Sequence, residues 1–199
     1  MQKITSILML VVWLSSGNIL AQAGQQRVDA KETASLEPGR EKHALQILAK
    51  LAEKEIVSAA DAMPADKYGF APTDGEFKGV RSFGQMVKHL SATNYILAAA
   101  ALGEEPPADA GDELGPEAVR TKAEILNYLK GSFAYLDKAI EAIGQKTAPV
   151  KSSPISPLKS TEATRLALAV ESLVHAFDHY GQMVEYLRMN GVVPPASRP

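Results

Sequence analysis

The chain has 199 residues, with 21 lysines and arginines against 23 aspartates and glutamates and a formal net charge of −2. This balance provides no long-range positive field, so we expect no nucleic-acid binding and no electrostatic attraction to an anionic membrane. The chain contains no cysteine, which excludes disulfides and a lipid attached through a cysteine thioether. An apolar core must therefore stabilise the fold.

The first 23 residues have the features of a secretory signal peptide. Lys3 precedes an apolar run over residues 4–20, and a small-residue Ala-Gln-Ala sequence ends at Ala23. The rival interpretation is an uncleaved membrane anchor, and the polar residues 15–18 inside the run argue against it. We predict cleavage after Ala23, export to the periplasm or the medium, and no stable membrane association of the mature chain.

The mature chain is long enough for one domain with a sizeable apolar interior. Its composition predicts three parts: a flexible N-terminal segment over residues 24–37, a helical domain over residues 38–193 and an extended tail over residues 194–199.

A first amphipathic helix is predicted between Pro38 and Met63. Apolar residues recur there at spacings of three and four, as in a helix with one buried face. Pro64 and the segment 67–75 then break the pattern. The expected buried set is Leu45, Leu48, Ala52, Ile56, Ala59 and Met63.

Capping signals predict where the second and third helices begin. Ser82 with Gln85, and Thr121 with Glu124, form the capping-box pattern. The second helix should run to about Leu102 and end at a glycine, after which the acidic stretch 103–113 is interpreted as a solvated loop. The third helix should run to a glycine at 144, with room for a short helical turn at residues 116–120 before it.

The final helix is predicted over residues 161–190, after a long connection at residues 145–160, and Gly191 supplies its stop. Helical winding places Leu166, Val170, Leu173, Phe177 and Val184 on one side, which we interpret as the core stripe. Four amphipathic helices in one domain predict an all-α four-helix bundle with long loops between helices 2 and 3 and between helices 3 and 4.

Two histidines, His175 and His179, are four residues apart on the final helix. Residues at this spacing lie about 6 Å apart on one helix face, so two imidazoles can bind one metal ion. His89 on the second helix, which we expect to point inward, can supply a third ligand. A helical His-x-x-x-His pair is also common without any metal. Ala176 stands where a metalloprotease would carry its general base, which argues against peptidase activity of that type.

Polar neighbours of the histidine pair offer further roles. Tyr180, Asp178 and Gln182 can hydrogen-bond the outer imidazole nitrogens, as ligating histidines usually require, or lie at the surface. Glu171, one turn before His175, can serve as a fourth ligand that closes the coordination shell. The remaining histidine, His43, is expected to be exposed.

Three blocks in this order resemble the DinB-like (DinB/YfiT) superfamily of four-helix metal-binding proteins. They are residues 63–73, residues 80–90 and residues 175–183 leading into 187–195. The resemblance implies that His89, His175 and His179 bind a divalent transition metal, zinc, nickel or iron, with water at the remaining positions. It also implies an unusual helix order and a homodimer.

The function expected from this resemblance is that of an exported, metal-dependent hydrolase or transferase acting on a small molecule, with no catalytic residue assigned beyond the metal ligands. Export argues against the use of a low-molecular-weight thiol, as in several relatives, because reduced thiols are scarce outside the cytosol. The alternative is a non-catalytic metal-binding or stress-related bundle. The third possibility is a helical bundle whose histidines bind no ligand.

Overall fold

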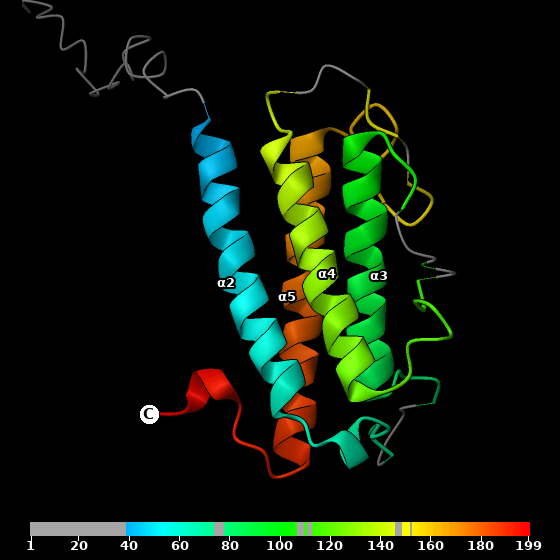
Figure 1. The fold of residues 1–199 in the computed structure, drawn as a ribbon, viewed down its shortest axis with the longest axis vertical. Helices are drawn as coiled ribbons and strands as arrows, with labels where there is room; N and C mark the ends of the chain where they lie inside the picture. Colours follow the sequence, from blue (N-terminus) through cyan, green and yellow to red (C-terminus); the bar gives the residue numbers. More distant parts are fainter. Residues whose placement is uncertain (1–38, 74–77, 107–109, 111–112, 146–148, 152) are drawn as a thin grey trace, which may run out of the picture. The chain divides into compact units, whose positions relative to one another are not determined.

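The computed structural model describes residues 39–73, 78–106, 110, 113–145, 149–151 and 153–199 (Figure 1). The described residues form no strand. They form four helices, α2 (Arg40–Ala62), α3 (Phe83–Leu102), α4 (Lys122–Glu141) and α5 (Arg165–Met189), and two short 3-10 turns, η1 (Ala65–Lys67) and η2 (Pro195–Ser197). The predicted signal peptide and the segment 24–37 lie outside this part of the chain. None of the described helices is long and apolar enough to cross a membrane.

The four helices pack as the predicted all-α bundle. α3 packs against α4 and α5, and α2 packs against the same two helices. α2 and α5 run in one direction while α3 and α4 run in the other (Figure 1). Because α3 and α4 are parallel neighbours, the connection between them has to return along the bundle. This return brings residue 113 against α3, which is important for the site.

The capping boxes begin α3 and α4 as predicted. The Ser82 hydroxyl accepts a hydrogen bond from the backbone N–H of Gln85, and the Gln85 side chain accepts one from the backbone N–H of Ser82 at 2.9 Å. Thr121 and Glu124 make the same reciprocal pair at the start of α4. Gly103 ends α3 with a left-handed φ of 75°. Residues 116–120 form a turn rather than a helix, with one hydrogen bond from Val119 N–H to the Pro116 carbonyl.

The beginning of α5 and the chain end differ from the prediction. α5 begins at Arg165, four residues later than expected, because the Thr164 hydroxyl caps it by accepting from Ala167 N–H at 3.0 Å. The prediction of an extended tail over residues 194–199 is wrong at Pro195–Ser197, which form the 3-10 turn η2. This turn contacts α2. Pro195 favours this turn because its fixed φ suits the first helical position.

The core face of α5 matches the predicted stripe only in part. Leu173 is buried, and Phe177 and Val184 are partly buried. Leu166 and Val170, however, are 38% and 42% exposed. The buried face is the one that carries the histidines, with Leu168, Ala169, Ser172, Leu173, Ala176, His179, Met183, Tyr186 and Leu187. α5 has apolar residues on two faces, and periodicity alone cannot tell which face the other helices cover. On α2, Leu48 is likewise exposed while Ala49 is buried.

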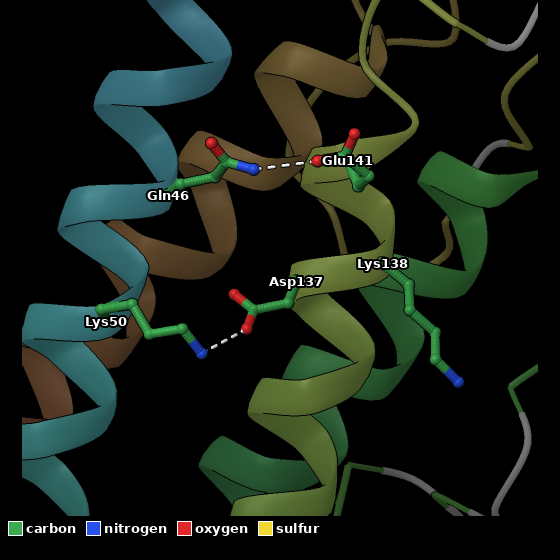
Figure 2. A pocket seen from close by; sticks show the side chains of 5 residues that line it. All are labelled: Gln46, Lys50, Asp137, Lys138 and Glu141. Atoms are coloured by element: carbon green, nitrogen blue, oxygen red, sulfur yellow. Dashed lines mark hydrogen bonds and ion pairs between the residues drawn. The ribbon is translucent and has the colours of Figure 1, made fainter.

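The outer contact between α2 and α4 is polar. Figure 2 shows Gln46 and Lys50 on α2 reaching Glu141 and Asp137 on α4, while Lys138 is directed away from α2. The Gln46 amide donates to the Glu141 carboxylate at 2.9 Å. These residues line a shallow pocket of about 410 Å³. Exposed ion pairs of this kind contribute at most about 1 kcal/mol each, so the apolar core dominates the stability of the bundle.

Candidate metal centre

The packing of α3 against α5 brings the three predicted histidines together. His89 is 4% exposed and His179 is 8% exposed, while His175 is partly buried. The Nε2 atom of His175 lies 3.1 Å from Nε2 of His89 and 3.1 Å from Nε2 of His179. One ligand nitrogen from each ring falls within 4.8 Å of the others, so the three side chains could hold a metal ion.

Burial keeps these imidazoles neutral. Burial, followed by the neighbouring His179 and His89, lowers the pKa of His175 to about 3. Burial is also the largest influence on the pKa values of His89 and His179, and both are lowered. At neutral pH all three rings therefore offer a lone pair, which is the form that a metal ion binds.

The position of His89 determines which of its nitrogens is free. Its Nδ1 lies 3.0 Å from the backbone carbonyl of Glu113, and a carbonyl can only accept, so Nδ1–H donates. Neutral His89 then presents an unprotonated Nε2 to His175. Such a hydrogen bond to the outer nitrogen is what orients a ligating histidine.

The outer nitrogens of the other two rings have no such partner. Within the described part of the chain, Nδ1 of His175 and Nδ1 of His179 are buried without a hydrogen bond. The Tyr180 hydroxyl donates to Glu55, and the Gln182 amide donates to Asp178. Asp178 and Gln182 lie at the surface, the second of the two alternatives for these residues, and both still raise the pKa of His179 against the larger effect of burial.

The donor set fits a divalent transition metal. Metal–nitrogen distances of about 2.0–2.1 Å place neighbouring ligands about 2.8–3.4 Å apart, in octahedral or tetrahedral geometry, and the two 3.1 Å separations agree with this range. Each neutral imidazole carries a single N–H, on one of its two nitrogens. Without a cation, these three protons cannot provide a hydrogen bond for both close Nε2 contacts and for the outer Nδ1 atoms as well. A cation resolves this by accepting all three lone pairs.

Glu171 is not a member of the cluster. Among the described residues, the group of potential ligands contains only the three histidines. The Glu171 carboxylate instead accepts a hydrogen bond from the Ser156 hydroxyl at 2.7 Å. No described residue joins the group as a fourth ligand, so a coordination shell built from this part of the chain would have three protein ligands, the number typical of catalytic rather than structural zinc sites.

Glu113 is a residue of this site that the sequence did not reveal. It is the only non-glycine among the described residues with a positive φ, at 66°. Its carbonyl holds His89, and its carboxylate lies 3.5 Å from the same Nδ1 atom. A left-handed backbone is unfavourable for a side chain with a Cβ atom and is often found at functional sites. The acidic loop around it gave no spacing signal for this role.

The geometry agrees with the comparison against known families. The family profile of the DinB superfamily matches residues 48–183, which include all three histidines. The chain belongs to the DinB superfamily. Among curated proteins, none matches it. The predicted family assignment and the all-α bundle are thus confirmed, and the fourth histidine, His43, is exposed on α2 as expected.

Proposed function

We propose that this DinB-superfamily protein is exported and binds one divalent transition metal, zinc, nickel or iron, through His89, His175 and His179. We further propose that it uses the metal as a hydrolase or transferase of a small molecule. The observation that supports the metal site is the convergence of three neutral imidazoles, in which Nε2 of His175 lies 3.1 Å from Nε2 of each of the other two. The signal-peptide features of residues 1–23 support export.

A divalent metal in a site of this kind polarises an acyl or phosphoryl oxygen and lowers the pKa of a coordinated water toward about 7. The contributions of the chain itself follow from its contacts. Glu113 fixes the tautomer of His89 through its carbonyl, and the surrounding core excludes water from the ligand nitrogens. Three protein ligands leave coordination positions open for a substrate.

A non-catalytic metal-binding protein is the second candidate. The observation that favours it is the burial of His89 and His179, which are only 4% and 8% exposed. Deep burial slows exchange of the metal and limits the approach of a substrate. A protein that sequesters a metal benefits from both effects.

Turnover distinguishes the two candidates. The mature protein, loaded separately with zinc, nickel or iron, is assayed against small esters, amides and phosphate esters and against acyl acceptors. Catalysis predicts turnover that depends on the metal, disappears in His179→Ala and persists in the exposed control His43→Ala. Full metal content without turnover on any substrate would favour the second candidate.

N-terminal mass analysis of the exported protein should give a chain that begins at Gly24; an intact Met1 would contradict cleavage.

A further inference from the structure

Two buried hydroxyls lie one turn from the histidine cluster, on the two helices that form it. Thr93 follows His89 by four residues on α3, and Ser172 precedes His175 by three residues on α5. Residues at these spacings share a helix face about one turn apart. Because α3 and α5 run in opposite directions, both hydroxyls lie on the same side of the cluster (Figure 1). They are therefore at the same level of the α3–α5 interface.

Neither hydroxyl has a hydrogen-bond partner within the described part of the chain. Thr93 is 3% exposed and Ser172 is fully buried, and their side-chain oxygens are both unpartnered. The other buried serines of the bundle, Ser91 and Ser132, each donate to a carbonyl of their own helix, at 2.8 Å and 2.7 Å. A buried polar atom without a partner is rare in folded proteins and commonly marks the place of an ordered water or a ligand.

Nδ1 of His175 is a third buried, unpartnered polar atom at this level. A helical side chain leans toward the N-terminus of its helix, so the His175 ring extends over the turn that carries Ser172. When Nε2 of a neutral imidazole holds a metal, Nδ1 carries the proton and has to donate it. The His89 ring already has the Glu113 carbonyl for this purpose. His175 needs an acceptor on the side of Ser172.

The opposite side of the cluster is apolar. Met86 precedes His89 by three residues, and Met183 follows His179 by four, so both lie on the same helix faces beyond the histidines. They are 2% and 0% exposed. A thioether is at most a weak acceptor, so this side requires no solvent. The two unpartnered hydroxyls thus lie on one side of the cluster, where the His175 ring needs its acceptor.

We propose that Thr93 and Ser172 hold one buried water, which accepts the Nδ1–H of His175 and so positions this histidine for metal binding. The water accepts from His175 and from one hydroxyl, and it donates to the other. These three hydrogen bonds are the usual number for a buried water. The inference rests on the proposed metal site and adds two positioning residues to it; neither hydroxyl holds the metal.

The experiment uses the full-length mature protein with Zn²⁺ and variants that separate the hydroxyl from the shape of the side chain. Thr93→Val removes the hydroxyl and keeps the branched shape, whereas Thr93→Ser keeps the hydroxyl. Ser172→Ala removes the second hydroxyl. The matched control is Ser91→Ala, because Ser91 is fully buried in α3 but has its own hydrogen bond. Dissociation constants for Zn²⁺ are measured by competition with a chromophoric chelator, and far-UV circular dichroism is recorded for each variant.

The affinity for zinc should fall about tenfold in Thr93→Val and in Ser172→Ala, the effect of losing an outer partner of a ligating histidine. Thr93→Ser and Ser91→Ala should bind zinc as the parent does. The second readout is the histidine side-chain ¹H–¹⁵N spectrum of the zinc-loaded protein. In the parent, Nδ1–H of His175 should give a slowly exchanging signal with a cross-peak to water. Both features should be lost in Thr93→Val and Ser172→Ala, whereas a role in packing alone would leave them unchanged.

Three results would overturn the inference and leave the metal site standing. They are parent-like zinc affinity in either Thr93→Val or Ser172→Ala, a parent His175 Nδ1–H without a cross-peak to water, and an equal loss of affinity in Thr93→Ser and Thr93→Val. A parent that takes up no zinc would refute the metal site, and the inference with it.

Discussion

Acidification should destabilise the metal-free protein because His175 is buried in its neutral form. Its pKa is 6.5 in the unfolded chain and about 3 in the folded protein. Between these values the unfolded state binds more protons than the folded state, so the free energy of unfolding falls as the pH falls. The loss begins near pH 6.5 and is complete below about pH 3.

The magnitude follows from the two pKa values. Between pH 7 and pH 5 the unfolded chain becomes almost fully protonated at this position while folded His175 stays neutral. The cost is about 2 kcal/mol for this one group. The pKa values of His89 and His179 are lowered as well, so the total loss from the cluster should be larger than this.

Urea unfolding at pH 7 and pH 5, in the presence of a chelator, measures the effect. We compare the parent with His175→Gln, and we use His43→Gln as a matched control because His43 is exposed. The loss of stability on acidification should be about 2 kcal/mol smaller in His175→Gln than in the parent and unchanged in His43→Gln. An equal loss in His175→Gln and the parent would refute the reasoning.

Three further predictions concern the site and the core. His179→Ala should remove the metal while far-UV helicity is largely kept; full metal stoichiometry in that variant would contradict the assignment. Leu168→Ala, at a fully buried position, should lower the free energy of unfolding by about 2–5 kcal/mol, whereas Leu166→Ala on the exposed face should cost less than about 1 kcal/mol. If both variants lost the same free energy of unfolding in urea, the assignment of the buried face of α5 would be contradicted. Glu113→Gly should be more stable than Glu113→Ala by about 1 kcal/mol in the same assay, because only glycine adopts a φ of 66° without strain; a less stable glycine variant would argue against this backbone conformation.

Local signals predicted α3 and the position of His89 well. The Ser82 and Gln85 pair satisfies the first free backbone groups of the helix, and this depends only on residues close together in the chain. Once the helix begins there, His89 falls two turns later on its buried side. The spacing of His175 and His179 was equally informative, because i and i+4 residues on any helix share a face.

Tertiary contacts decided the features that the sequence left open. Leu166 and Leu168 are both leucines on α5, and only the packing of α2, α3 and α4 determines that Leu168 is the buried one. Glu113 acquires its role because the return between two parallel helices passes His89, which no local pattern records.

The most direct test of the three-histidine site is the metal content of the mature protein, purified without a metal-binding tag. Elemental analysis is carried out on the parent, on His89→Ala and on the exposed control His43→Ala, each before and after reconstitution with zinc, nickel or iron. The account predicts about one transition metal per chain in the parent and in His43→Ala, and little in His89→Ala. Equal metal in His89→Ala, or no metal in the parent even after reconstitution, would contradict it.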